Sequence, residues 1–371
     1  MRCLALMHLE KKVATICGDG SCAVHCPSFM PYNLRLENAD GSDCDLRAKN
    51  LDQFYHWCAA RPLTLERNDA KNFLIRHGFQ EDKTDRERAK IALRCHGLCL
   101  TDAFWIREIE ENIRFDQINL FDSPLSDEYV DIVLRDRGMI AKNLGLMDEA
   151  SALAETNTPN VWARREDGYW LLKAGAPDEV AAEWTASQIA RCFDVDQVLY
   201  EPAAYQGRPV SRSKLVTSKE WSIVFAGDMG EYLRNEGKSL WELVSSQDEY
   251  GFHMMNIIDY LIGNTDRHWR NWGFWVSNED NQPGKLFPLM DFNRSFRAYD
   301  TLEGDQCFPL KGKMTQRAAA VWGVQKIGLN QNKALPKDLP SLFSDLNMLC
   351  QTRMDVMFQA RLDVLRRAAR R

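Results

Sequence analysis

The sequence predicts an α+β protein with a mixed, mainly helical N-terminal domain, then a small β-rich lobe, then a helical lobe. Hairpin patterns at 160–173 and 272–290 predict the sheets, because each joins two strand-like runs through turn residues. An apolar helical period at 254–262 and an amphipathic pattern at 339–371 predict the helical lobe. The expected bounds of the three parts are 1–145, 146–222 and 223–371.

The N-terminal domain is expected to begin with strands and to continue with helices. Residues 1–40 favour a small β-rich element. The pattern from Leu46 to Ile113 is mainly helical, with Asn68 or Asp69 as an N-cap and Gly78 as a stop. Nothing in this part resembles a motif with a known chemical role, so we expect it to regulate the rest of the chain or to bind a partner.

The first hairpin and the helix after it carry an amine and a carboxylate. Residues 160–165 and 169–173 flank a turn, so Lys173 lies at the end of the second strand. A helix is expected after Pro177, with Glu183 on one face. A surface pair of this kind contributes at most about 1 kcal/mol, so the two residues alone would indicate nothing beyond local structure.

A strand-like segment from Leu215 to Thr217 is expected to leave this lobe. It lies between the β-rich and helical patterns, inside SRSKLVTSKEWSIVFA. We therefore expect it to connect the two lobes.

The segment from Met254 to Asn264 predicts a helix that ends beside a polar loop. Its apolar residues recur at helical spacing, and Gly263 with Asn264 supplies the stop. Asp266 therefore lies in the loop that follows. Its carboxylate could stabilise a turn through backbone hydrogen bonds, or it could face a bound substrate.

The second hairpin is expected to bring two oxygen-bearing side chains to its open end. In an antiparallel pair the start of the first strand lies beside the end of the second, so Asn271 and Asp291 should meet there. An amide oxygen and a carboxylate suit Mg²⁺, which is usually held by one or two protein groups. Either residue could also belong to an ordinary turn, so the evidence is the order and spacing of all three polar residues.

The motifs TDRHWRN and PLMDFNRSF, which carry these residues, resemble those of the HipA-like kinases. The Asp-Arg-His-x-x-Asn core is also similar to that of the phosphoinositide 3- and 4-kinases. The resemblance covers mainly residues 150–310, and it implies a diverged, two-lobed protein-kinase-like fold. It also implies a catalytic Asp followed five residues later by a metal-binding Asn, a spacing that Asp266 and Asn271 reproduce.

The resemblance assigns roles in the loop and the second hairpin. Asp266 would accept or orient the hydroxyl proton, and Asn271 and Asp291 would hold Mg²⁺. His268 would orient the catalytic loop, unless it is a buried hydrogen-bonding residue without a chemical role.

The resemblance also assigns the ATP-binding residues. Lys173 would contact the phosphates while Glu183 fixes its ammonium group, and backbone groups around Val216 to Ser218 would meet adenine. One departure lies in the expected phosphate-covering loop, LAETNTPNVW, which has no glycine. Asn157 could replace it, because Asn tolerates left-handed backbone conformations.

The acceptor stays open. The resemblance favours protein serine or threonine, including autophosphorylation at Ser151, Thr156 or Thr158. A lipid or a small molecule is an alternative, because the core residues contact phosphates and carry no signature of the acceptor. A regulator that binds nucleotide without transferring phosphate, and acts through its N-terminal domain, is a third reading, against which the intact Asp266 counts.

The other charged and aromatic residues of the loop favour structural roles. Arg267 and Arg270 are more typical of a solvated loop face than of phosphate contacts. Alternation along a half-buried strand explains four aromatic residues as core. These are Trp269, Trp272, Phe274 and Trp275.

The amino-acid composition and net charge exclude some classes of protein. The 371 residues have a net charge of −6, which disfavours a nonspecific nucleic-acid binder. The mixed charges between Arg61 and Arg94 favour a solvated helical face over a helix-turn-helix surface. No run is long and apolar enough for a membrane span or a signal peptide, so we expect a cytoplasmic protein with no membrane partner.

The cysteines favour a reducing compartment. There are 11, scattered along the chain and odd in number, which argues against a disulfide framework. A group of zinc-ligand type lacks the usual Cys-x-x-Cys spacing, which disfavours a zinc site. It consists of Cys17, Cys22, His25 and Cys26. A second group, Cys95, His96 and Cys99, falls at helical spacing and is expected in the core.

Overall fold

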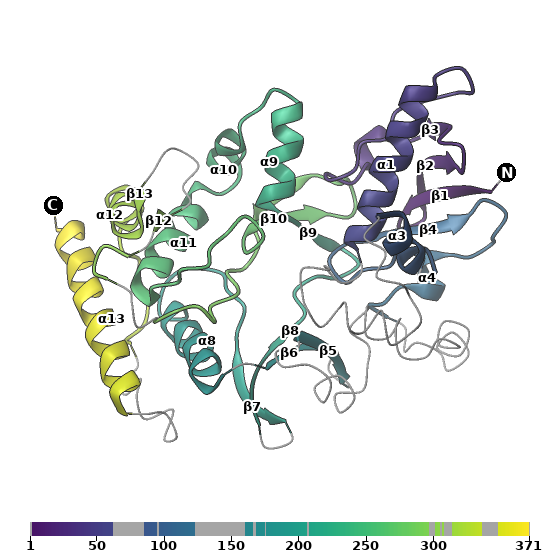
Figure 1. The fold of residues 1–371 in the computed structure, drawn as a ribbon. Coiled ribbons are helices and arrows are strands. Elements are labelled where there is room, and N and C mark those ends of the chain that lie inside the picture. Colours follow the sequence, from purple (N-terminus) through teal and green to yellow (C-terminus); the bar gives the residue numbers. More distant parts are fainter. Residues whose placement is uncertain are drawn as a thin grey trace.

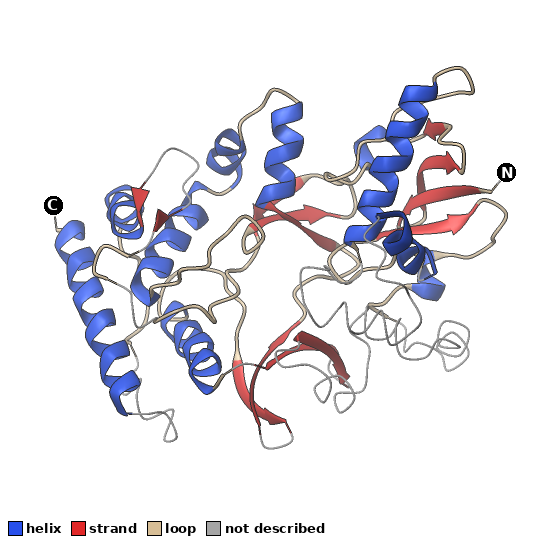
Figure 2. Cartoon of the chain, in the orientation of Figure 1, coloured by secondary structure: helices blue, strands red, loops and turns tan. Residues whose placement is uncertain are grey.

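The chain is described from a computed structural model. It covers residues 2–61, 85–94, 96–122, 160–165, 168–174, 176–205, 208–296, 301–304, 306–307, 314–335 and 348–370. Figure 1 shows the chain passing from the purple N-terminal strands on one side to the yellow C-terminal helix α13 (Met348–Ala369) on the other. Strands lie mostly toward the N-terminal side and helices toward the C-terminal side (Figure 2).

Several expectations fall on residues outside these ranges and stay predictions. They concern the N-cap at Asn68 or Asp69, the stop at Gly78, the boundary near 145, the candidate phosphorylation sites Ser151, Thr156 and Thr158, the residue Asn157, and Cys95.

The N-terminal domain is a four-stranded antiparallel sheet in the order β3-β2-β1-β4. Its strands are β1 (Cys3–His8), β2 (Lys11–Cys17), β3 (Cys22–Val24) and β4 (Phe104–Glu108). Alternate residues divide between its two faces: Leu6 and Ile106 join the core beneath the helices, while Ala5 and Trp105 join a second cluster on the other face. The β-rich start is therefore confirmed.

Helices cover the first of these faces. They are α1 (Cys44–Ala60) and α3 (Asp85–Arg94), while the short helix α4 (Phe115–Ile118) contributes to the opposite face. Figure 1 shows α1 and α3 beside the N-terminal sheet. A short 3₁₀ turn, Pro27–Phe29, precedes them.

The expectation of a mainly helical stretch up to Ile113 was wrong at its end. β4 pairs with β1, so Phe104 lies opposite His8, a partner almost one hundred residues away. Helix α3 ends at Arg94, where the Gly97 N–H donates to the Ala92 carbonyl oxygen at 2.7 Å. His96 and Gly97 both have positive φ, 53° and 62°, which a helix does not allow.

Two cysteines are joined by a disulfide, although the scattered cysteines were not expected to form a disulfide framework. Cys3 and Cys17 form a disulfide, because the β1–β2 register places them opposite each other with Cα atoms 4.0 Å apart. Cys17 is therefore bonded to sulfur. His25, from the same group, contacts Thr15, with 2.9 Å between Nε2 and Oγ1.

A second four-stranded antiparallel sheet has the order β5-β6-β8-β7. Its strands are β5 (Asn160–Arg165), β6 (Gly168–Ala174), β7 (Glu201–Tyr205) and β8 (Arg208–Lys214). The first predicted hairpin is confirmed, with Asn160 opposite Lys173. The predicted helix is α8 (Pro177–Ala190). The expected strand at 215–217 was wrong, because β8 ends at Lys214 and these residues form the connection to the next strand.

The second predicted hairpin is confirmed and gains a third strand. β10 (Gly273–Ser277) pairs with β11 (Pro283–Leu286) on one side and with β9 (Trp221–Phe225) on the other. β9 is thus an edge strand of the sheet β11-β10-β9.

The remaining helices surround the buried helix α11 (Glu249–Ile262). They are α9 (Ala226–Asn235), α10 (Leu240–Gln247), α12 (Gln316–Ile327) and α13, with a two-stranded ribbon of β12 (Gln306–Cys307) and β13 (Met314–Thr315). α11 starts five residues before the predicted position and ends as predicted at Gly263, which has φ 62°. Its apolar face belongs to a large core that α13 joins through Phe358 and Leu365. Every described helix is too short or too polar to cross a lipid bilayer.

Two asparagines fasten the N-terminal domain to the β10–β11 hairpin. Asn278 Oδ1 accepts a hydrogen bond from Ser222 Oγ at 2.6 Å and lies 3.2 Å from His8 Nε2. Asn281 Nδ2 donates to the Ser28 carbonyl oxygen at 3.0 Å. These side chains are buried, so the hydrogen bonds are shielded from competing water.

The connection between β8 and β9 contacts the same domain. Thr217 Oγ1 donates to the Leu100 carbonyl oxygen. In β9 itself, the Ile223 N–H donates to the Thr101 carbonyl oxygen at 3.0 Å. The N-terminal domain therefore holds both the connecting segment and the hairpin.

Candidate active site

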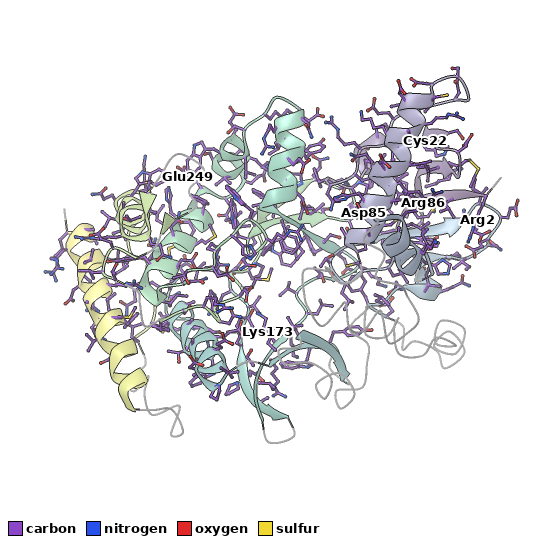
Figure 3. The ribbon with its side chains drawn as sticks, viewed as in Figure 1. Arg2, Cys22, Asp85, Arg86, Lys173 and Glu249 are labelled. Carbon is purple, nitrogen blue, oxygen red and sulfur yellow. A yellow bond between two sulfur atoms is a disulfide. The ribbon has the colours of Figure 1, made fainter. Side chains whose placement is uncertain are left out.

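Three side chains from separate elements meet at one point. Lys173 lies near the end of β6, Glu183 lies on α8, and Asp291 follows β11; Figure 3 labels Lys173. Lys173 Nζ donates to Glu183 Oε1 at 2.8 Å and to Asp291 Oδ1 at 3.0 Å. The side chain of Glu183 is 1% exposed and that of Asp291 is 28% exposed. The predicted Lys173–Glu183 pair is present, and it extends to Asp291.

Electrostatics favour the charged forms of Lys173 and Asp291. Burial alone would lower the pKa of Lys173, but Tyr200, Glu183 and Asp291 raise it well above its ordinary value. Burial alone would raise the pKa of Asp291, but the charge of Lys173 and its hydrogen bond lower it, with help from Arg267. Both groups are therefore charged near neutral pH.

Glu183 is fixed from its other side. Ser211 on β8 donates from Oγ to Glu183 Oε2. The strand register explains the contact, because Ser211 lies directly opposite Lys173. Two neighbouring strands therefore hold both oxygens of one buried carboxylate.

The backbone of Asp291 has a left-handed conformation, with φ 61°. Asp is among the few residues other than glycine that tolerate this region. The Asp291 N–H donates to Tyr200 Oη at 3.0 Å, and Asn264 Nδ2 donates to the Asp291 carbonyl oxygen at 3.3 Å. These contacts hold the turn that points the carboxylate at Lys173.

Arg267 joins the helix, the loop and the hairpin, contrary to the expectation of a solvated loop face. It is 8% exposed, and its Nε and Nη2 donate to the Asp259 carboxylate at 2.8 and 3.0 Å. Its Nη1 donates to the carbonyl oxygens of Asn271 and Met290, at 2.5 and 2.7 Å. The two ends of the hairpin therefore meet through one guanidinium group, in agreement with the predicted approach of Asn271 and Asp291.

The loop between α11 and β10 is held by its own polar groups. Asn271 Nδ2 donates to the Asp266 carbonyl oxygen at 2.7 Å, and the Asp266 N–H donates to Asn264 Oδ1 at 3.1 Å. His268 Nδ1 accepts from the Arg270 N–H at 3.1 Å, while His268 Nε2 lies 4.0 Å from Asp266 Oδ1. The Asp266 side chain stays 42% exposed. The loop therefore presents a carboxylate to solvent from a fixed backbone.

The aromatic residues of this region fall into a buried group and an exposed one. Trp272 and Phe274 belong to the core as predicted, with 2% and 0% exposure. Trp269 is 37% exposed and packs against Trp272, with 5.9 Å between ring centroids.

The residues expected near adenine lie in the connection between β8 and β9. The side chain of Val216 packs against the main core. The Ser218 N–H donates to the Trp221 carbonyl oxygen at 2.9 Å, and Ser218 Oγ accepts from the Glu220 and Trp221 N–H groups. Ser218 is therefore committed to the turn before β9.

The arrangement combines the charged amine of Lys173, two carboxylates in contact with it, and the exposed carboxylate of Asp266 on a loop with a fixed backbone. Among the described residues no three or more His, Cys, Asp or Glu side chains gather as a metal site. The oxygen-bearing pair Asn271 and Asp291 still suits Mg²⁺, because this ion commonly takes most of its ligands from water and phosphate. Asn271 commits its amide nitrogen to Asp266, and among the described residues its Oδ1 has no hydrogen bond.

Comparison with known proteins identifies the fold. No protein-family model and no curated protein matches this sequence. The chain is similar to HipA of Shewanella oneidensis, solved in a toxin-antitoxin complex with HipB and operator DNA. The TM-score is 0.54 at 12% sequence identity, and the match covers 98% of this chain and 97% of HipA. The predicted resemblance is therefore confirmed at the level of fold.

A kinase is among the similar structures. The proinflammatory kinase CtkA of Helicobacter pylori matches with a TM-score of 0.46 and 14% identity, over 58% of this chain and 90% of CtkA.

Proposed function

We propose that this chain is an ATP- and Mg²⁺-dependent kinase that transfers the γ-phosphoryl group to a hydroxyl, with protein serine or threonine as the acceptor. The observation that carries the proposal is the contact of Lys173 Nζ with both Glu183 and Asp291. An ammonium group held between a buried carboxylate and a partly exposed one suits phosphate oxygens beside a metal ion. The HipA-like fold over nearly the whole chain supports the same reading.

The proposed metal ligands are Asp291 and the Oδ1 of Asn271. Asp291 keeps its charge near neutral pH, since Lys173 lowers its pKa against the effect of burial. When bound, Mg²⁺ would neutralise charge on the phosphates. Lys173 would exchange part of its contact with Asp291 for a phosphate oxygen, while Glu183 continues to orient it.

Asp266 is the proposed base. The acceptor oxygen forms a bond to the γ-phosphorus while the bond from that phosphorus to the β,γ-bridging oxygen breaks, and ADP leaves with that oxygen. The hydroxyl proton passes to the Asp266 carboxylate. His268 would orient the loop through its hydrogen bond to the Arg270 N–H.

The adenine contact is proposed for backbone groups around Val216, in the connection that Thr217 fastens to the N-terminal domain. Ser218 is a weaker candidate than the sequence suggested, because its N–H is bonded to Trp221. The sequence also leads us to expect a regulatory partner protein, which would bind the N-terminal domain.

The test is incubation of the purified chain with labelled ATP and Mg²⁺, alone and with a cell lysate, followed by mass spectrometry of labelled species. Asp266→Asn is the principal variant, and Asp363→Asn, an exposed change on α13, is the matched control. We expect label on protein serine or threonine with the wild type and the control, and none with Asp266→Asn.

Other outcomes would redirect the proposal. Label on a lipid or a small molecule would retain the kinase and replace the acceptor. ATP binding without any labelled product would favour a nucleotide-binding regulator that acts through its N-terminal domain.

A further inference from the structure

A groove between the N-terminal domain and helix α9 lies outside the contacts described so far. Its volume is about 760 Å³, and its walls come from α1, from β9 and from α9. Arg270, four residues after Asp266, also lines it. The Gly227 N–H at the start of α9 donates to the Trp269 carbonyl oxygen at 3.0 Å, so the same loop packs against α9. The groove therefore adjoins the loop that carries the proposed base.

The backbone of β9 presents a free edge to this groove. In β10, Gly273 and Ser277 direct their backbone groups toward β11: the Phe287 N–H donates to Gly273, and the Ser277 N–H donates to Gln282, both at 3.1 Å. Their partners across β9 are Phe225 and Trp221. Because hydrogen-bonded and non-bonded pairs alternate in an antiparallel ladder, every second residue of β9 turns its groups away from β10.

Ile223 and Phe225 are two of these outward-facing residues, and both line the groove. The Ile223 N–H is taken by Thr101. Among the residues that the structure describes, neither the Ile223 carbonyl oxygen nor the Phe225 N–H has a hydrogen-bond partner. A donor and an acceptor spaced two residues apart on an edge strand form a template for one residue of an added strand.

The charge of the groove favours a cationic occupant. Asp228 and Glu231, three residues apart on α9, both line it, and neither belongs to an ion pair within the described part of the chain, although Asp228 is near enough to Arg270 and His56 to interact with them electrostatically. Three basic groups in the wall are already paired with acids, over 2.7, 2.6 and 3.3 Å. The pairs are Arg61 with Asp102, Lys49 with Glu37, and Arg35 with Glu236. Arg270 offsets one of the two negative charges of Asp228 and Glu231, so the side chains of the groove that have no ion-pair partner carry a net negative charge.

We propose that the groove binds the acceptor as an extended peptide, which pairs with the free edge of β9 and places a lysine or arginine beside Asp228 and Glu231. This inference rests on the proposed kinase function and names the substrate class of that site. The peptide would run from the acidic face of α9 toward the catalytic loop, because Arg270 and Gly227 connect the two.

Two sets of synthetic peptides test the acidic face. Each peptide has one serine in a neutral background, with a single arginine or a single glutamate at successive positions, and kcat/KM is measured with the full chain. We expect one arginine position to raise kcat/KM on the order of tenfold over glutamate, as for two partly exposed ion pairs. Asp228→Asn with Glu231→Gln should abolish this preference, and Glu110→Gln with Asp363→Asn, which removes the same charge elsewhere, should keep it.

The β9 edge is tested by methylating the backbone nitrogens of the best peptide one at a time. One methylated position should lower kcat/KM severalfold by removing the N–H that donates to Ile223, while positions facing away should tolerate methylation. Tolerance at every position would refute strand pairing.

A charge-reversed chain, Asp228→Lys with Glu231→Lys, should prefer glutamate peptides, which a merely damaged fold would not produce. Wild-type phosphorylation of arginine and glutamate peptides at equal rates would overturn the inference and leave the kinase intact. Failure of the wild type to label any peptide, lysate protein or itself would instead count against the proposed function.

Discussion

Arg267→Met should destabilise the chain far more than a loop substitution ordinarily does. The guanidinium donates two hydrogen bonds to Asp259 and two to backbone carbonyl oxygens, all in a buried position. Removing it leaves the Asp259 carboxylate, 4% exposed, without its cation. Breaking one side of a buried ion pair typically costs about 3–5 kcal/mol, a large part of the stability of most domains.

The partner substitution should cost less. Asp259→Asn keeps the shape of the side chain, and Arg267 still donates to the carbonyl oxygens of Asn271 and Met290. We therefore expect the free energy of unfolding to fall by about 1–3 kcal/mol. The double variant should be more stable than Arg267→Met alone, because it leaves no unpaired buried carboxylate.

Urea unfolding followed by tryptophan fluorescence measures all three variants, with Arg317→Met, whose side chain is 40% exposed, as the control. The control should shift the free energy of unfolding by at most about 1 kcal/mol. A loss below about 1 kcal/mol for Arg267→Met, or a strictly additive double variant, would refute the view that this ion pair joins the loop to the hairpin.

Three further predictions concern the site, the hairpin and the interface. Lys173→Met should reduce phosphoryl transfer at least about a hundredfold, because it removes the charge beside Glu183, whereas Lys12→Met, at an exposed position of β2, should not; a labelled-ATP assay compares them. Gly273→Ala should lower the free energy of unfolding by about 1–3 kcal/mol, because a Cβ there would lie 2.1 Å from a backbone oxygen of β9. Gly284→Ala should leave it almost unchanged in the same urea assay, because a Cβ at that position would lie 4.0 Å from its nearest atom. Burial is the main cause that lowers the pKa of His8 below 6.5, so the folded state resists protonation; the stability it contributes is complete above pH 6.5 and falls as the pH drops through the folded pKa. Unfolding at pH 7.5 and 5.0 should therefore show a larger loss for the wild type than for His8→Gln, and equal losses would contradict this assignment.

The residues that the sequence identified share a local pattern. Asp266, Asn271 and Asp291 stand at the ends of elements whose periods are clear, and antiparallel pairing alone brings the hairpin ends together. Lys173 and Glu183 lie ten positions apart on a strand and the helix after it. Short-range rules were therefore sufficient to place these residues at the ends of their elements, and the resemblance of the motifs to those of the HipA-like kinases was needed to select them as functional.

The residues that sequence reasoning missed depend on distant partners. Ser211 contacts Glu183 because the register of β6 with β8 places Ser211 opposite Lys173. Residues 104–108 form a strand because they pair with β1, which is distant in the sequence. Arg267 looked like a loop charge because its partner, Asp259, lies within an apolar helix. An acid within that buried stripe was the available signal, since a buried carboxylate requires a cation.

The asparagine contacts between the N-terminal domain and the β10–β11 hairpin bear on how this chain can be divided. Asn278 and Asn281 satisfy groups on both sides of the junction, including the Ser28 carbonyl oxygen and His8. A cut between the domain and the remainder would leave these polar groups without their partners, including His8, which packs against Phe29 and Phe104 within the N-terminal domain. Inheritance and recombination should therefore pass on the two parts as one unit, and a chimaera that replaces the first should succeed only if it brings the matching hairpin turn with it.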